Sequence, residues 1–311
     1  MVLSRASHLP SPDPMRIDAR QVRRNFERAA PRYDAAAFLP REVGRRMLER
    51  LDCVKFDPKR VLDLGCGTGA DLHALSERYP NAAVVGADFC ERMLREGRSR
   101  RSISRWLLPR LLRARAPLVL ADAGALPFAG ASIGLVWSNM MLHWSANPLL
   151  VFQEALRVLE PGGLLMFSTL GPGTLRELRA CFTDACAHTL HFTDMHDTGD
   201  MLVECGFIDP VLDVETLRLT YRSLKDLVTE LRQNGATCAA PDRRRALMGR
   251  DAWRAVENRF REHAVDGRLP ATFEVIYGHA IRRQKTEDRR QKTEKLAAAT
   301  PPWKSDKKPI G

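Results

Sequence analysis

The sequence predicts an α/β fold built on a mostly parallel sheet with helices on both faces. Three observations lead to this prediction. Short apolar segments alternate with helical segments from residue 61 to residue 169. A glycine-rich turn, Gly65–Gly69, follows the first apolar segment, and aspartates lie at the ends of the first three, at Asp63, Asp88 and Asp122. Short apolar strands separated by amphipathic helices are typical of sheets covered on both faces.

The elements follow from the spacing of apolar residues. Between Asp18 and Leu51 these residues recur at helical spacing, and Pro31 and Pro40 interrupt the pattern, so two helices are expected. The expected elements then alternate as strand 61–64, helix 71–78, strand 83–87, a helix beginning at 91–97, strand 118–121, strand 133–138, helix 148–159 and strand 164–169. Strand character resumes at residues 272–281.

Four segments depart from this alternation and outline the domain organisation. Residues 1–15 are polar and proline-containing, and we expect them to be disordered. Residues 98–116 form a basic insert, interpreted either as a solvated amphipathic helix or as a docking surface for an acidic partner. Residues 173–267 are expected to form a mostly helical cap over the ligand end of the sheet, with late sheet strands. Residues 284–311 are expected to form a disordered or helical basic tail. The predicted domain therefore spans residues 16–283.

The composition of the 311-residue chain argues against several classes of protein. No apolar run approaches the ~20 residues of a membrane span, and the N-terminus lacks the apolar core of a secretory signal, so a cytoplasmic location is expected. The net charge of +11 favours an acidic partner. Nucleic acid is disfavoured, because no aromatic side chains interleave the basic residues of the tail. The seven cysteines form no C-x-x-C pair, so no metal site is expected, and their odd number in an expected cytoplasmic protein predicts reduced thiols.

The glycine turn predicts a nucleotide-type ligand at the carboxyl ends of the strands. It reads Asp-x-Gly-x-Gly-x-Gly from Asp63, whereas dinucleotide-binding dehydrogenases carry G-x-G-x-x-G. A carboxylate at Asp63 would repel a diphosphate and suits a cationic ligand. Asp88 is expected to accept hydrogen bonds from ribose hydroxyls, and the Asp122–Ala123 pair from an adenine amino group. The predicted ligand residues are Asp63, Gly65, Gly67, Gly69, Asp88, Asp122, Ala123 and Asn139.

The pattern from Asp63 to Gly69 resembles the first motif of class I S-adenosylmethionine-dependent methyltransferases. The resemblance implies S-adenosyl-L-methionine as cofactor, bound by the residues just named. It also implies a Rossmann-like fold with a seven-stranded, mostly parallel sheet, helices on both faces and a helical cap. The segment Ser138–Trp144 would line the space where the methyl donor meets its acceptor.

Later motifs narrow the resemblance. Phe26–Asp34, Phe167–Leu178, Leu231–Thr237 and Gly267–Gly278, with shorter matches between residues 125 and 144, resemble the malonyl-[acyl-carrier-protein] O-methyltransferases of biotin synthesis. The similarity covers about residues 23–283. It implies methyl transfer to the free carboxylate of malonyl-[acyl-carrier protein] or malonyl-CoA, which yields a methyl-ester primer for biotin synthesis. That carboxylate is already ionised near neutral pH, since carboxyl groups have a pKa of ~4, so no acid–base residue is expected to be required.

Two needs of such a substrate suggest further residues. A carboxylate in a partly dry pocket needs cationic or hydrogen-bonding partners. The candidates are Arg176 and Arg179, Tyr33 as a lid residue, and His143, which is interpreted mainly as pocket wall. An acidic carrier protein needs a basic surface, and the candidates are the basic insert and residues 243–250. Reversing the charges of Arg113, Arg115, Arg243 and Arg244 is predicted to weaken carrier binding.

Three alternatives stay open at this stage. A branch of the same superfamily that serves complex I assembly and hydroxylates a protein arginine shares similar Thr-Leu-x-Glu-Leu-Arg and Leu-Pro-Ala-Thr motifs. The segment Arg28–Asp34 favours the biotin branch over it. The second alternative is a small-molecule carboxyl methyltransferase, and the third is a non-catalytic assembly factor that binds the donor.

Overall fold

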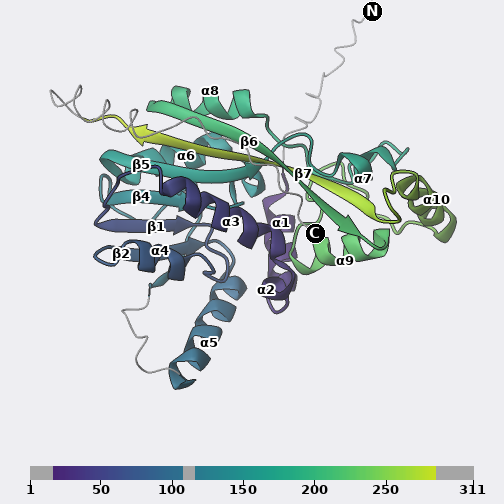
Figure 1. Ribbon diagram of the computed structural model, residues 1–311, viewed down its shortest axis with the longest axis horizontal. Coiled ribbons are helices and arrows are strands. Elements are labelled where there is room, and N and C mark those ends of the chain that lie inside the picture. The colour runs from purple at the N-terminus through teal and green to yellow at the C-terminus, as the bar shows by residue number, and fades with distance from the viewer. Residues whose placement is uncertain (1–16, 108–115, 285–311) are drawn as a thin grey trace, which may run out of the picture.

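The fold is that of a computed structural model, which describes residues 17–107 and 116–284 (Figure 1). The predictions for residues 1–15 and for the tail beyond residue 284 therefore lie outside the described residues. Within the described ranges, no helix is long and apolar enough to cross a membrane.

A seven-stranded sheet forms the centre of the molecule, with strand order β3-β2-β1-β4-β5-β7-β6. The strands are β1 (Arg60–Leu64), β2 (Ala83–Asp88), β3 (Leu118–Leu120), β4 (Ile133–Ser138), β5 (Leu159–Leu170), β6 (Phe207–Tyr221) and β7 (Leu269–Arg282). The first five strands are parallel, and β7 pairs antiparallel with both β5 and β6. The predicted mostly parallel, seven-stranded sheet is confirmed. Strand order reverses between β1 and β4, which is where open α/β sheets bind their ligands.

Helices begin within one residue of the expected residues 71, 91 and 148, but three helices lie between residues 18 and 51, where two were expected. The helices are α1 (Ala19–Ala29), α2 (Tyr33–Ala36), α3 (Phe38–Leu51), α4 (Leu72–Arg78), α5 (Glu91–Leu107), η2 (Leu142–Trp144), α6 (Pro148–Val158), α7 (Arg176–Ala180), α8 (Met195–Cys205), α9 (Leu224–Gln233) and α10 (Arg250–Arg261). Pro31 separates α1 from α2, as expected. Pro40 does not break a helix, because it lies in the first turn of α3, where a missing N–H costs nothing. Residues 98–107 of the basic insert continue α5, and residues 108–115 lie outside the described part.

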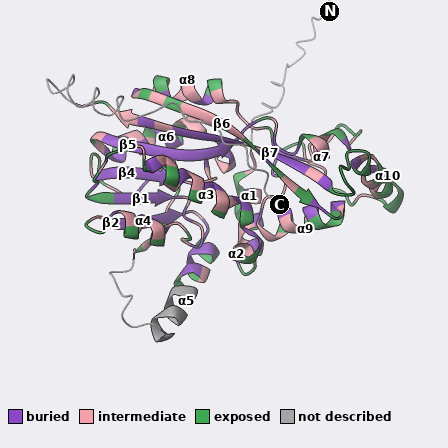
Figure 2. Ribbon diagram, in the orientation of Figure 1, coloured by how far each residue is buried: buried purple, intermediate pink, exposed green. Residues whose placement is uncertain are grey.

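Alternating side chains of the strands pack into two apolar layers. On one face Leu135 and Trp137 of β4 pack in a cluster with α3 and α4. On the other face Val136 packs in a cluster with α6 and α8. Figure 2 shows that the central strands are buried while colours mix on β6. The sheet therefore holds its carboxyl ends rigid between two packed layers.

The segment expected to be a mostly helical cap, residues 173–267, also contains the 15-residue strand β6. This strand lies at the sheet edge, and its residues alternate between more exposed and more buried positions. Charged residues such as Asp213, Glu215 and Arg218 therefore interrupt its apolar ones. A continuous apolar run is typical of strands that are buried on both faces. An edge strand with one exposed face lacks such a run.

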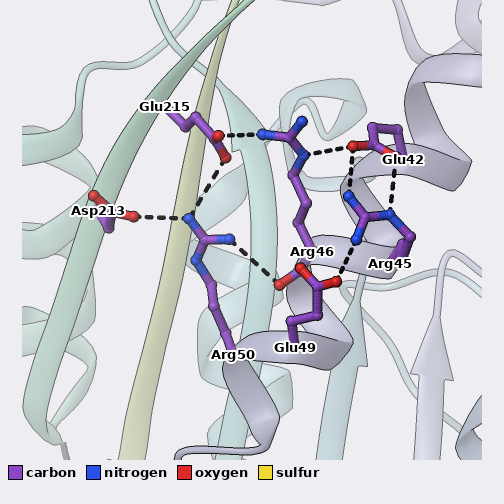
Figure 3. Close-up of polar contacts among 7 residues, drawn as sticks. All are labelled: Glu42, Arg45, Arg46, Glu49, Arg50, Asp213 and Glu215. Atoms are coloured by element: carbon purple, nitrogen blue, oxygen red, sulfur yellow. Dashed lines mark hydrogen bonds and ion pairs between the residues drawn. The ribbon is translucent and has the colours of Figure 1, made fainter. Parts of the chain in front are cut away.

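Ion pairs join helix α3 to this edge strand (Figure 3). Arg46 pairs with Glu215, and Arg50 pairs with Asp213 at 2.8 Å. The Arg50 guanidinium also lies 3.6 Å from the centroid of the Tyr277 ring on β7. Because α3 precedes the sheet in sequence and β6 lies near the end of the domain, these contacts fasten the N-terminal helices to the last strands.

We predict that Arg50→Ala destabilises the protein by about 2 kcal/mol, because the substitution removes a mostly buried cation from two carboxylates and an aromatic ring. Only 12% of the Arg50 side chain is exposed. The matched control is Arg45→Ala on the same helix, whose side chain is 54% exposed and pairs with Glu42. It should cost only about 0.5 kcal/mol. Urea unfolding midpoints measure both effects, and equal losses would contradict the prediction.

Candidate ligand site at the strand ends

A cavity of about 290 Å³ lies at the carboxyl ends of β1 and β4. Five of the residues predicted from the sequence line it, namely Tyr33, Asp63, Gly65, Gly67 and Asn139. Four further polar residues that the sequence did not single out also line it: Asp34, Arg41, Thr68 and Asp71. The N-terminal helices thus cover a site whose floor is the end of the sheet.

The glycine turn has a backbone that only glycine adopts easily. Gly65, Gly67 and Gly69 have φ angles of 78°, 55° and 79°. The amides of Gly65 and Cys66 both donate to the carbonyl of Ala87 at the end of β2, at 2.8 and 3.0 Å. A Cβ atom on Gly65 would lie 2.3 Å from Cγ of Met141, so the turn has no room for a side chain there.

Asp88, the last residue of β2, stabilises this turn through its side-chain carboxylate. Its Oδ2 accepts a hydrogen bond from the Gly67 amide at 2.9 Å, and its Oδ1 accepts one from the Cys90 amide at 2.8 Å. Burial raises the pKa of Asp88 to about 6, despite the two amide donors. Each carboxylate oxygen retains capacity for another hydrogen bond, because it has two lone pairs.

A hydrogen-bonded cluster around Asp71 closes another side of the cavity. Asp71 Oδ2 accepts from Trp137 Nε1 and from Asn139 Nδ2, both at 3.0 Å. The Asn139 amide also donates to the carbonyl of Pro40 at 2.8 Å. Helix α3 approaches so closely that a Cβ on Gly44 would lie 2.8 Å from Asp71 Oδ1. The sequence signal for Asp71 is its place just before α4. Its side chain makes no capping bond there, however, and lines the cavity instead.

Carboxylates dominate the cavity's charge. Asp34, Asp63 and Asp71 line it, whereas Arg41 is the one basic residue among its described lining. Asp34 accepts from Thr68 Oγ1 at 2.6 Å, and Arg41 donates to the Asp34 carbonyl. Such an arrangement favours a cationic ligand.

Tyr33 faces the same cavity as a neutral hydrogen-bond donor. Burial, with the negative charges of Asp88 and Asp71, raises the pKa of its phenol well above the ordinary value. The hydroxyl therefore stays protonated at neutral pH. It can orient a ligand by donating a hydrogen bond, but it cannot act as a base there.

A second cavity, of about 480 Å³, lies beside η2 and the start of α6. His143 lines it together with Thr169, and Thr169 Oγ1 is 3.4 Å from His143 Nδ1. Burial lowers the pKa of His143 to about 3, so its ring is neutral at physiological pH. His143 thus lines this cavity as a neutral ring, and its role toward a ligand stays a prediction.

A chain of aromatic rings connects the two cavities. The Phe26 ring centroid is 6.4 Å from that of Tyr33 and 5.3 Å from that of Trp144. The Trp144 centroid is in turn 5.1 Å from that of His143. Tyr33 of the first cavity and His143 of the second are thus linked through Phe26 of α1 and Trp144 of η2, which line neither cavity.

Six predicted residues line neither of these two cavities, namely Gly69, Asp88, Asp122, Ala123, Arg176 and Arg179. Arg176, whose side chain is 59% exposed, pairs with Glu177 at 3.4 Å. Arg179 donates to the carbonyls of Pro172 and Thr174, at 2.8 and 2.6 Å. Asp122 is exposed, and its Oδ1 accepts from the Gly124 amide at 2.8 Å. Ala123 packs against the apolar cluster around α6.

Gly69 closes the glycine turn through its own amide, which donates to the Cys66 carbonyl at 2.7 Å. It lies outside the lining of the two cavities. Within residues 17–107 and 116–284, no group of three or more His, Cys, Asp or Glu residues is arranged to hold a metal ion.

Comparison with known proteins identifies sequence relatives. A family model described as a methyltransferase domain matches residues 62–167. A malonyl-[acyl-carrier protein] O-methyltransferase from Methylovorus sp. (strain MP688) is 50% identical over 271 residues, which cover 86% of this chain and 90% of that protein. The protein of the same name from Laribacter hongkongensis is 48% identical over 281 residues, covering 88% of this chain and 94% of that protein.

Solved structures share the fold at low identity. The [4+2]-cyclase SpnF aligns with a TM-score of 0.57 at 16% identity, covering 89% of this chain and 100% of that one. The YcgJ protein of Bacillus subtilis aligns with a TM-score of 0.55 at 14% identity, covering 78% of this chain and 99% of that one. These two matches establish the architecture and say nothing about the substrate.

We predict that Asp88 titrates near pH 6 in the ligand-free protein. Because this pKa exceeds the ordinary value of ~4, the folded protein binds the proton more tightly than the unfolded chain. The resulting stability is fully present below about pH 4 and is lost as the pH rises through about 6. The ¹³Cγ chemical shift of Asp88, assigned by its disappearance in Asp88→Asn, reports the titration. A midpoint near 4 would show that burial does not control this carboxyl.

Proposed function

The chain belongs to the family of malonyl-[acyl-carrier protein] O-methyltransferases, and from this premise we propose that it methylates the free carboxylate of malonyl-[acyl-carrier protein] with S-adenosylmethionine as donor. The product would be a methyl-ester primer for biotin synthesis. The observation that supports this reaction best is the carboxylate-lined cavity at the switch point, whose Tyr33 is linked through the rings of Phe26 and Trp144 to His143 of a second cavity.

The residues of the first cavity fit this donor. Asp63 and Asp71 suit its positively charged ammonium and sulfonium groups, and Arg41 suits its carboxylate. The glycine turn lets the donor approach the backbone closely, because no Cβ atoms stand in the way. Asp88 would accept from the ribose hydroxyls with its remaining lone pairs. Asp122 and Ala123 would contact the adenine beyond the cavity. The bound donor would supply an electrophilic methyl group on a positively charged sulfur.

The protein's contribution to the reaction is alignment and exclusion of water. The acceptor carboxylate is already ionised, so no residue has to remove a proton. Tyr33 keeps its proton and would donate a hydrogen bond to a carboxylate oxygen, while neutral His143 would form the wall of the acceptor cavity. Arg176 and Arg179 remain predictions as partners of the acceptor carboxylate. Arg176 has the weaker existing contacts of the two.

The reaction is tested with purified protein, S-adenosylmethionine and malonyl-[acyl-carrier protein], by intact mass and fragmentation. The expected result is one added methyl group on the malonyl carboxylate, and rescue of a biotin-requiring strain that lacks its own methyltransferase. One added oxygen on a protein arginine would instead support the complex I assembly branch. Methylation of malonyl-CoA alone would identify a small-molecule carboxyl methyltransferase. Donor binding without transfer to either substrate would indicate a non-catalytic protein.

We predict that Gly65→Ala raises the dissociation constant for S-adenosylmethionine by about tenfold or more, since the new methyl group would collide with Met141 and distort the turn. The control is Gly162→Ala. Gly162 has the same φ of 78°, but the added Cβ approaches only the Gln284 side chain, at 2.8 Å.

Calorimetric titration measures donor affinity, and thermal unfolding of both variants separates lost binding from lost folding. The control should bind the donor within about twofold of the unsubstituted chain. Unchanged affinity in a folded Gly65→Ala variant would place the donor elsewhere.

A further inference from the structure

We propose that the exposed arginine face of α1, formed by Arg20, Arg24 and Arg28, docks an acidic face of the carrier protein that presents the acceptor. This inference rests on the proposed function, since it concerns how a protein-bound substrate reaches the same site. It differs from the surfaces that the sequence suggested, which were the basic insert and residues 243–250.

The three arginines are spaced four residues apart, so they form one row along the helix. All three are exposed, and their side chains make no ion pair or hydrogen bond with any described residue. Glu27 is the one acidic residue of the helix. Like charges at this spacing repel each other and weaken a helix, so a matching row of carboxylates would relieve the repulsion.

The opposite side of α1 is fixed to the rest of the protein. Val22 is fully buried, and Asn25 Nδ2 donates to the carbonyl of Thr237 at 3.2 Å. The Asp18 side chain caps the helix by accepting from the Gln21 amide at 3.0 Å. The arginine row is therefore held on a rigid support, as a docking surface requires.

The support also places the row at the rim of the proposed site. Phe26, on the buried side of the same helix, contacts Tyr33, which lines the first cavity, and Trp144, which packs against His143 of the second. Figure 1 shows α1 beside α2 and α9, beyond the ends of the central strands. A carrier docked on this helix would hold its attached acceptor group close to the region between the two cavities.

The competing basic residues are less available. Arg243 donates to Asp18 and Gln21 of the α1 cap, and Arg244 pairs with Asp184 at 2.8 Å. Arg113 and Arg115 lie outside the described residues. On α1, by contrast, no described ion pair competes with an acidic protein partner for the three arginines. Complementary charges of this kind mainly speed and orient association.

The test is the triple variant R20E/R24E/R28E. We expect the dissociation constant for labelled malonyl-carrier protein, measured by fluorescence anisotropy, and the KM for the same substrate to rise at least about tenfold. The kcat and the turnover of malonyl-CoA should stay within about twofold, because neither depends on docking. Added salt should weaken carrier binding to the unsubstituted chain more than to the variant, since salt screens surface charges.

The matched control is R245E/R250E/R254E, which makes the same change of charge on exposed residues at and before α10. It should leave carrier binding within about twofold. Weaker binding in the control but not in the α1 variant would overturn the inference in favour of the region around residues 243–250. Unchanged binding in both variants would overturn it as well. An unsubstituted chain that binds the carrier but transfers no methyl group would instead refute the proposed function, while the anisotropy data would still decide the docking surface.

Discussion

The amide of Asn139 is the point on which the arrangement of the site depends. It joins segments far apart in the sequence, because it bonds to Asp71 at the start of α4 and to the Pro40 carbonyl in the first turn of α3. Its carbonyl oxygen accepts from Ser168 Oγ of β5 at 2.9 Å. The end of β4 is thereby fixed to its neighbouring strand and to the helix above it. Together with the bond from Thr68 to Asp34, these bonds hold the N-terminal helices at a defined height over the glycine turn.

The ion pairs between α3 and β6 also fix the position of the N-terminal helices, at a distance from the cavity. Helix α3 contributes Pro40 and Arg41 to the cavity at its beginning and Arg46 and Arg50 to the sheet edge further along. Because a helix is stiff, fixing one end determines where the other lies. The antiparallel strands β6 and β7, which take no part in the glycine turn, therefore still influence the geometry of the donor side. The last third of the chain thereby helps to position a site built on the first half.

The sequence was most informative where local chemistry dictates the structure. The glycine turn and the first five strands were predicted within a few residues, except that β5 begins earlier than expected, because runs of apolar residues signal burial on both faces. Late strands were expected between residues 173 and 267, but the edge strand β6 was not located, because charges such as Asp213 alternate along it. Asp71 and Arg41 were missed for a different reason: an aspartate before a helix is typical of a cap, and an arginine in a basic helix is typical of a solvated face. The place of Asp71 depends on its bond with Asn139, 68 positions away, and Arg41 reaches the cavity only through the folding of α3 over it; spacing along one element reveals neither.

The hydrogen bond between Thr68 and Asp34 has a kinetic consequence. It joins the glycine turn to the segment after α1, so this segment lies over the donor side of the cavity while the η2 side is bounded separately. A donor that enters or leaves between these two segments would have to break this hydrogen bond. A carrier docked on α1 would keep the hydrogen bond between Thr68 and Asp34 formed. The two substrates of the proposed reaction would then bind in a compulsory order, donor before carrier, and the demethylated donor would depart last.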